Sequence, residues 1–168
     1  VGIVMGPYLA NRFGKKKVYL TAVIISTALN LLRLLDVTSM ILIYISALIG
    51  GVAGGWMVPV STSIQADNTT YVQYKTGKRA EAAIASLTSF VSKVAQGLGG
   101  AIPGYVIAAY GFVTGASVQP ESINTGIILC ALILPLIFGI LGSLIFGTQY
   151  TLDQKAVIEM DAKINRNN

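Results

Sequence analysis

The chain has 168 residues, of which 54% are hydrophobic and 11% are charged. Soluble domains carry about 25% charged residues, so these charges are too few to cover a water-facing surface. The formal net charge is +5, but the basic residues lie in short clusters between long apolar segments, which is typical of membrane topology rather than of nucleic-acid binding. The composition therefore predicts an all-α membrane protein, with the lipid bilayer as its partner and no nucleic acid.

The first apolar stretch, residues 1–10, is too short to cross a bilayer, because a spanning helix needs about 20 residues. The chain begins inside this stretch at Val1. We therefore interpret residues 1–10 as the end of a transmembrane helix, and we expect the helices upstream of it to be missing. A basic cytoplasmic loop is expected at 11–17.

The rest of the chain is expected to cross the membrane four times, at 18–35, 40–63, 82–110 and 125–146. The connections are a polar cytoplasmic loop at 64–81, an external loop at 111–124 and a hydrophilic cytoplasmic tail at 147–168. Near the outer end of the first crossing, Arg33 and Asp36 are three residues apart, a spacing that favours a local ion pair.

The basic residues predict the orientation of these segments. Ten of the 12 Lys and Arg residues lie in the loops 11–17 and 64–81 and in the tail 147–168, which share one side if the four crossings alternate. Loops rich in Lys and Arg stay on the cytoplasmic side. We therefore expect a multi-pass protein of the cell membrane (plasma or inner membrane) with its C-terminus in the cytoplasm.

Lys93 is the first candidate for a functional residue, because it lies about 12 residues, or roughly 18 Å, into the 82–110 helix. A charge at that depth costs at least a few kcal/mol, so such residues usually line a pathway or cavity. The alternative is a structural lysine that snorkels along its own stem. A polar stripe shares its helix face, consisting of Ser86, Ser89, Lys93, Gln96 and Gly100. The serines could equally form hydrogen bonds between helices.

Trp56 is the second candidate, because it lies beside Pro59 in the 40–63 segment. An aromatic face can stack on the apolar C–H side of a sugar ring. Tryptophan is equally common as an anchor at the membrane interface. The sequence leaves both interpretations open.

Nothing in the sequence indicates an enzyme. There is no histidine, and the single cysteine, Cys130, lies in an apolar run without a neighbouring base. Hydrolytic and metal chemistry need such groups close together. We therefore expect neither a catalytic residue nor a metal site.

Residues 6–17 (GPYLANRFGKKK) resemble the loop signature of the major facilitator superfamily, Gly…Asp-Arg-x-Gly followed by two basic residues. In that superfamily the signature lies between helices two and three and again between helices eight and nine. Asn11 stands where the signature usually has Asp, which is a common weakening of the second copy.

Residues 66–81 (ADNTTYVQYKTGKRAE) resemble the loop between helices ten and eleven of the melibiose permease-like glycoside–pentoside–hexuronide:cation symporters. In that family a lysine follows the final Glu by twelve residues, and Lys93 follows Glu81 by twelve. Thr70 stands where the family usually has a second acid before the Tyr.

The resemblance covers nearly the whole chain and implies a partial C-terminal bundle of the major facilitator fold. Residues 1–10 would be the end of helix eight, and the four crossings would be helices nine to twelve. The resemblance implies a role for Lys93 in sugar binding and coupling, with Ser89 as a neighbouring cavity position; Trp56 aligns with no family motif. It also implies a cytoplasmic gate, formed by Asp67, Tyr71, Arg79 and Glu81.

The implied function is secondary active transport, in which a glycoside, pentoside or hexuronide crosses the membrane with a coupling cation by alternating access. The sugar, the cation (Na⁺ or H⁺) and the missing N-terminal helices would be the partners, and the cation site would lie in the missing N-terminal half. No other cofactor is expected. Two alternatives stay open: a major facilitator transporter for another solute, and a non-transporting membrane scaffold subunit.

Overall fold

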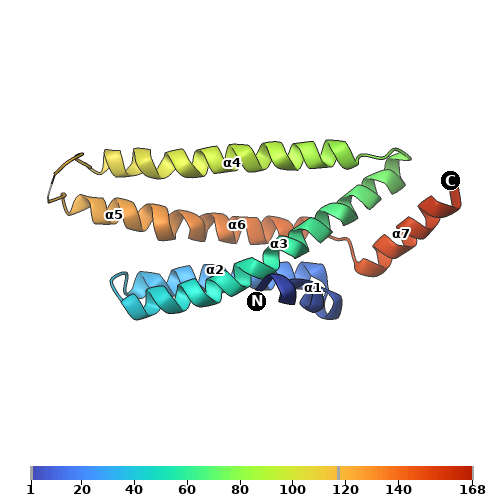
Figure 1. The fold of residues 1–168 in the computed structure, drawn as a ribbon, viewed down its shortest axis with the longest axis horizontal. Helices are drawn as coiled ribbons and strands as arrows, with labels where there is room; N and C mark the ends of the chain where they lie inside the picture. Colours follow the sequence, from blue (N-terminus) through green and yellow to red (C-terminus); the bar gives the residue numbers. More distant parts are fainter. Residues whose placement is uncertain (1, 117, 168) are drawn as a thin grey trace.

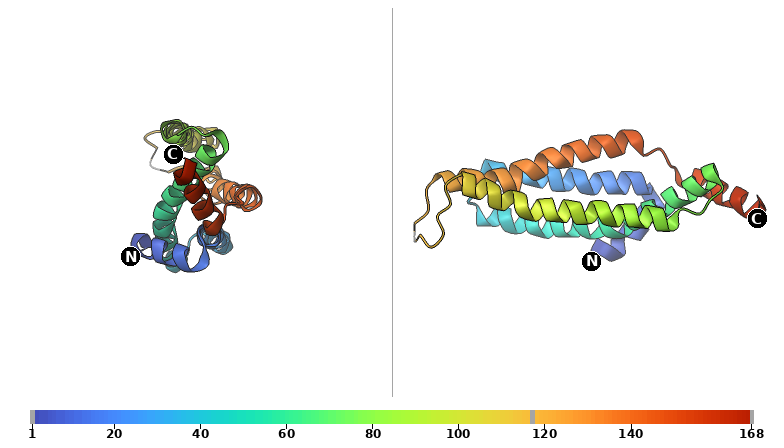
Figure 2. Two further views of the ribbon diagram at one scale, coloured as in Figure 1. Left: turned by 90° about the vertical axis from the view of Figure 1, so that its right-hand side faces the viewer. Right: turned by 90° about the horizontal axis from the view of Figure 1, so that it is seen from above.

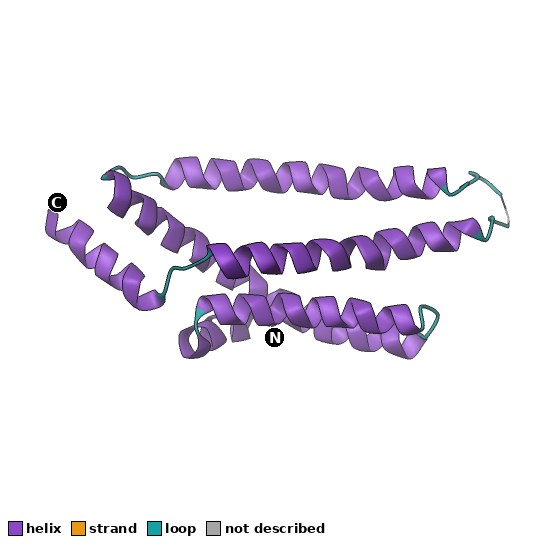
Figure 3. Ribbon diagram, turned by 180° about the vertical axis from the view of Figure 1, so that it is seen from behind, coloured by secondary structure: helices purple, strands orange, loops and turns teal. Residues whose placement is uncertain are grey.

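The structure is a computed structural model that describes residues 2–116 and 118–167. Val1, Ser117 and Asn168 belong to the expected segments 1–10, 111–124 and 147–168 and lie outside the described residues. Every regular element in the described part of the chain is a helix (Figure 3). The prediction of an all-α membrane protein is thereby confirmed.

The helices follow one another with short connections. The first four are α1 (Gly2–Phe13), α2 (Lys15–Leu35), α3 (Met40–Thr76) and α4 (Glu81–Ala109). After a longer loop, α5 (Ser122–Ile128) continues through a π-helical turn, η1 (Leu129–Ile133), into α6 (Leu134–Gln149). The chain ends with α7 (Gln154–Asn167).

Consecutive long helices run antiparallel (Figure 1). α2 packs against both α3 and α6, and α1 packs across α2 and α3. The C-terminal ends of α1, α3 and α6 lie at the same end of the bundle as the N-terminal ends of α2, α4 and α7 (Figures 1 and 2). We call it the basic end, because ten of the 12 basic residues lie in the sequence segments that meet there.

Within the described residues, three helices are long and apolar enough to cross a membrane: α2, α3 and the continuous α5–η1–α6 helix. Few residues of these three helices are buried by the described part of the chain, as expected for segments whose solvent is lipid. α4, which we also expect to cross, has 29 residues and is long enough, but Lys93 and Gln96 make its most apolar stretch less apolar than those of these three.

Two segments expected as loops are largely helical. α3 continues from the expected crossing to Thr76, because no glycine or proline interrupts the polar residues between Pro59 and Gly77. Gly77 ends the helix in the left-handed conformation with φ of 68°, and its N–H donates to the Gln73 carbonyl at 2.8 Å. In the basic loop only Gly14, with φ of 89°, separates α1 from α2.

α1 and α3 approach each other closely through small residues. Gly2, Gly6 and Ala10 recur every four residues and are all buried. A Cβ atom added to Gly6 would lie 2.7 Å from Cγ of Pro59 and 2.8 Å from the carbonyl oxygen of Trp56. Membrane helices use such small faces because close packing, rather than hydrophobicity, holds them together.

The expected ion pair between Arg33 and Asp36 does not form. The Asp36 carboxylate instead accepts hydrogen bonds from the Thr38 hydroxyl at 2.8 Å, the Thr38 N–H at 3.0 Å and the Ser39 N–H at 3.1 Å. These bonds, first the one from the Thr38 hydroxyl, lower the pKa of Asp36 below its usual value. A short side chain after a helix satisfies nearby turn amides more easily than it reaches back along the helix.

Candidate functional site

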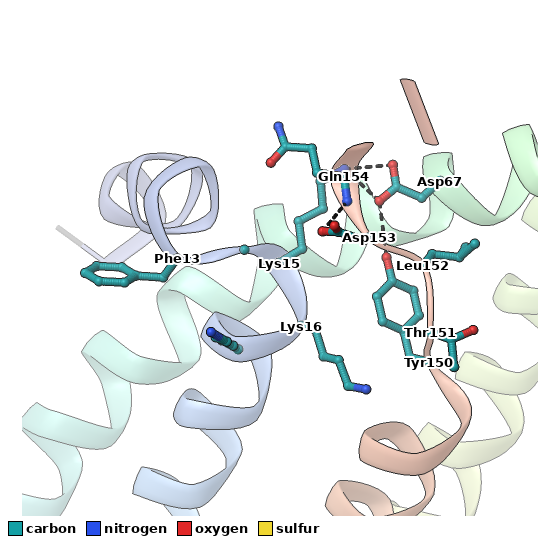
Figure 4. A pocket seen from close by; sticks show the side chains of 11 residues that line it. Phe13, Lys15, Lys16, Asp67, Tyr150, Thr151, Leu152, Asp153 and Gln154 are labelled. Atoms are coloured by element: carbon teal, nitrogen blue, oxygen red, sulfur yellow. Dashed lines mark hydrogen bonds and ion pairs between the residues drawn. The ribbon is translucent and has the colours of Figure 1, made fainter. Parts of the chain in front are cut away.

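The basic end holds a buried polar cluster of Lys15, Asp67 and Tyr150 (Figure 4). The Lys15 ammonium lies 2.7 Å from each carboxylate oxygen of Asp67. The Tyr150 hydroxyl donates to Oδ2 of the same carboxylate at 3.2 Å. Lys15 begins α2, Asp67 lies in the extension of α3, and Tyr150 follows α6 directly, so the cluster joins three helices that are distant in sequence.

Aromatic packing holds Tyr150 in place. Its ring stacks on Phe146 with a centroid distance of 4.9 Å, and Phe146 contacts Tyr19 of α2 at 4.6 Å. Tyr150 is part of the main buried core, together with Ala10, Val18, Val60 and Ile64. The cluster therefore adjoins the buried core through Tyr150.

The electrostatics of the cluster follow from its burial. Asp67 is only 6% exposed and is the one buried charged residue among the described residues, so its charge needs a close partner. Burial, followed by the negative charge of Asp67 and the hydrogen bond to it, raises the pKa of Tyr150 above its usual value. A pocket of about 280 Å³ opens beside the cluster, between the start of α2 and residues 150–154.

The residues predicted for the gate are divided between three places. Asp67 lies in the buried cluster, whereas Tyr71 is 38% exposed and has the Lys75 ammonium 5.9 Å from its ring centroid. Arg79 and Glu81 contact each other, with Nε and Oε1 4.0 Å apart, and both are exposed. The structure thus brings Arg79 and Glu81 together, but Asp67 pairs with Lys15.

Lys93 and Ser89 both lie on α4, and both are exposed. α4 has no buried residue, and it contacts α5 and η1 at one end and the end of α3 at the other. A Cβ atom added at Gly97, Gly100 or Gly104 would meet nothing within 4 Å. The side of α4 that carries the polar stripe is therefore uncovered by the described residues.

Trp56 lies elsewhere, in an apolar groove of about 350 Å³ between α1, α2 and α3. We call it the Trp56 groove, and its lining consists of Met5, Leu9, Phe13, Lys17, Val18, Thr21 and Trp56. The indole N–H of Trp56 is buried and has no hydrogen-bond acceptor among the described residues. The groove includes no residue of α4, so Trp56 and Lys93 do not share a pocket in the described part of the chain.

The sequence did not predict that Lys15 and Tyr150 are the partners of Asp67. Lys15 appeared only as one of three consecutive lysines, and Tyr150 only as a residue of the tail. The available signal was weak: both lie at the same membrane boundary as Asp67, but a shared boundary does not specify a contact. Among the described residues, no group of three or more His, Cys, Asp or Glu side chains could hold a metal ion.

Long apolar helices whose surface is left largely uncovered define an α-helical membrane protein. Residues 1–154 match the family described as "MFS/sugar transport protein", and the chain belongs to this major facilitator family of sugar transport proteins. The resemblance to the glycoside–pentoside–hexuronide:cation symporters is confirmed at the level of the family.

Three relatives illustrate the similarity. The chain is 30% identical to the glucuronide carrier protein homolog of Escherichia coli over 92% of its own length and 35% of the relative's. It is 32% identical to the uncharacterized symporter YjmB of Bacillus subtilis over 96% of its length and 35% of the relative's. It is 26% identical to the isoprimeverose transporter of Lactiplantibacillus pentosus over 74% of its length and 26% of the relative's.

The chain spans about a third of the length of these relatives at most. No solved structure matches it significantly.

Proposed function

We propose that this chain works as the C-terminal part of a sugar:cation symporter in the cell membrane, with N-terminal helices as its partner. Two similar proteins are named for sugars, a glucuronide carrier homolog and an isoprimeverose transporter, and a third is named a symporter. In this proposal two helical bundles rock around a central site, so that the sugar is exposed first to one side of the membrane and then to the other.

The exposed polar face of α4 is the single observation that supports this proposal most strongly. A lysine and a stripe of polar residues on a helix of 29 residues would be costly against lipid. They are acceptable against water, a sugar or a second bundle, and the described residues leave this face uncovered. Lys93 is then a wall of the sugar path, with Ser89 one turn away.

The basic end supplies the second part of the proposal. The cluster of Lys15, Asp67 and Tyr150 fastens α2, α3 and the end of α6 to one another, which allows these helices to move as a unit. Arg79 and Glu81 are exposed at the same end of the bundle, so they are free to contact a second bundle when the path closes on this side. In the proposed orientation this side is the cytoplasm, and Tyr71 belongs to the same closing surface.

The coupling cation, Na⁺ or H⁺, binds in this proposal to carboxylates of the N-terminal helices. Lys93 couples the sugar path to that cation, because its positive charge near the midplane is repelled by a cation that binds nearby. The glycosides, pentosides and hexuronides are the substrate class, and no further cofactor is required.

Sugar uptake by the full-length protein tests the proposal. Lys93→Ala should abolish cation-driven uptake of a radiolabelled glycoside or hexuronide, while the amount of protein in the membrane stays unchanged. Lys155→Ala removes the same charge from an exposed position outside the apolar part of the chain and serves as the matched control. Normal uptake by the Lys93 variant would contradict the assigned role of α4.

A further inference from the structure

The Trp56 groove has apolar walls and a basic residue, Lys17, as a site for an amphipathic molecule would have. Met5, Leu9 and Val18 make its walls apolar, and its volume is about 350 Å³. Among the described residues that line the groove, Lys17 is the only charged one, and none is acidic. The groove lies between helices that belong to the membrane-embedded part of the chain, so acyl chains have direct access to apolar walls of this kind.

The mouth of the groove lies at the basic end. Phe13 and Lys17 line both the Trp56 groove and the polar pocket beside Lys15, so the apolar space opens directly into a polar one. The Arg12 guanidinium lies 5.5 Å from the centroid of the Phe13 ring and adds a second positive charge near this mouth.

The charges at the mouth are available to a ligand. The Lys15 ammonium is neutralised by Asp67, but Arg12 and Lys17 are exposed and form no ion pair with any described residue. Two free cations beside an apolar groove match a molecule that carries a negative charge next to a hydrocarbon chain.

We propose that the Trp56 groove binds an anionic phospholipid of the adjacent leaflet. One acyl chain lies along Met5, Leu9 and Trp56, and the phosphodiester lies between Arg12 and Lys17. This assignment is independent of the proposed transport activity, because it uses only α1, α2 and α3 and no residue of α4. The lipid fills a gap that would otherwise leave apolar side chains without packing partners.

A protein segment is the competing occupant, since the chain spans only about a third of the length of its relatives. The charge pattern favours lipid, because a buried protein segment at this mouth would have to bring its own acids to meet Arg12 and Lys17. A phospholipid has an apolar chain that fits the apolar walls and a negative headgroup that fits the basic residues at the mouth.

Fluorescence quenching in reconstituted full-length protein tests this proposal. The protein is placed in vesicles of phosphatidylglycerol and phosphatidylcholine, in which either one lipid or the other carries brominated acyl chains at the same total composition. The signal of Trp56 is obtained as the difference from a Trp56→Phe variant. Bromines quench an indole only at contact, so the measurement reports which lipid lies in the groove.

We expect brominated phosphatidylglycerol to quench Trp56 several-fold more strongly than brominated phosphatidylcholine. In Arg12→Gln/Lys17→Gln, this preference should disappear, because each basic residue at an anionic surface strengthens the binding of anionic lipid by about fivefold. The matched control, Lys75→Gln/Lys78→Gln, removes two charges from the same end of the bundle and should retain the preference.

Three outcomes would overturn the proposal. Equal quenching by the two lipids would mean that the groove does not select the anionic headgroup. An equal loss of preference in both double variants would mean that only the general surface charge matters. Absence of quenching by either lipid would mean that protein fills the groove.

Discussion

The Lys15 ammonium lies 2.7 Å from both carboxylate oxygens of Asp67, although 52 residues separate the two in sequence. This pair links the start of α2 to the extension of α3, and the Tyr150 hydroxyl brings the end of α6 to the same carboxylate. The cluster is confined to this chain, so it stabilises the bundle itself, whatever the bundle contacts.

Removing one partner of this pair should destabilise the protein. Lys15→Met or Asp67→Asn is expected to lower the free energy of unfolding by about 2–3 kcal/mol. The cost lies below that of a fully buried pair, because 19% of the Lys15 side chain is exposed. The double variant should be less destabilised than the sum of the two, which a double-mutant cycle of unfolding in detergent would measure. Additive effects would show that the two groups do not interact.

Tyr150 should contribute mainly through its ring. Tyr150→Phe loses one hydrogen bond of 3.2 Å and keeps the stacking on Phe146, so we expect a loss of about 1 kcal/mol. Tyr150→Ala also removes the stacking and leaves a cavity, at a cost of about 3 kcal/mol or more. Unfolding measurements on both variants compare the hydroxyl with the ring, and equal losses would contradict this order.

The raised pKa of Tyr150 predicts a loss of stability in alkali. The folded protein keeps the phenol proton when the unfolded chain, with its usual tyrosine pKa of about 10, has lost it. The contribution is therefore complete below about pH 10 and decreases as the pH rises further. Tyr150→Phe should remove this part of the alkaline decrease. It should leave the tyrosinate absorbance that develops near pH 10 unchanged, and a smaller absorbance change would show that Tyr150 titrates normally.

α1 and α3 approach so closely that even one methyl group added at their contact should destabilise the protein. Gly6→Ala should destabilise the protein by about 1–3 kcal/mol, because the added Cβ would meet Pro59 and the Trp56 carbonyl at under 3 Å. Gly51→Ala on α3 is the matched control, since an added Cβ there meets nothing within 4 Å. Thermal unfolding of the two variants in the same detergent would measure the difference, and similar melting points would argue against tight packing at Gly6.

Substitutions of Arg79 and of Asp67 should distinguish an effect on transport alone from an effect on both stability and transport. The Arg79–Glu81 pair is long and exposed, so Arg79→Gln should change the free energy of unfolding by less than about 1 kcal/mol. If this pair meets a second bundle, the same variant should still lower sugar uptake. Uptake and melting temperature measured together distinguish it from Asp67→Asn, which should lower both. Unchanged uptake in Arg79→Gln would remove Arg79 from the gate.

The membrane class and the main apolar segments could be predicted from the sequence, because a long apolar run has few stable structures other than a membrane-spanning helix. The family could be predicted because residues 6–17 and 66–81 resemble its loop sequences. The expected crossing at 40–63 stops before α3 does, since hydropathy indicates where the bilayer ends and not where the helix ends. The polar residues up to Thr76 still favour a helix, and Gly77 is the residue that stops it.

Pairing was harder to predict than secondary structure. The resemblance to the symporters placed Asp67 in one gate with Arg79 and Glu81. In the structure Asp67 lies against Lys15. Three adjacent lysines offer three possible donors, and only the packing of α2 against α3 determines which one reaches the carboxylate. Tyr150 depends likewise on how α6 packs against α2, which no local pattern specifies.

The extension of α3 past the expected crossing has a mechanical consequence. Its residues after Ser63 reach about 20 Å farther at 1.5 Å per residue, with Gly77 at the tip and α7 packed along the side (Figure 2). A tilt of α3 by about 10° would carry that tip through about 3–4 Å for an arm of this length. If α3 tilts together with α2 and α6 as the proposed unit, the extension would act as a lever and would move Arg79 and Glu81 farther than the residues inside the bundle.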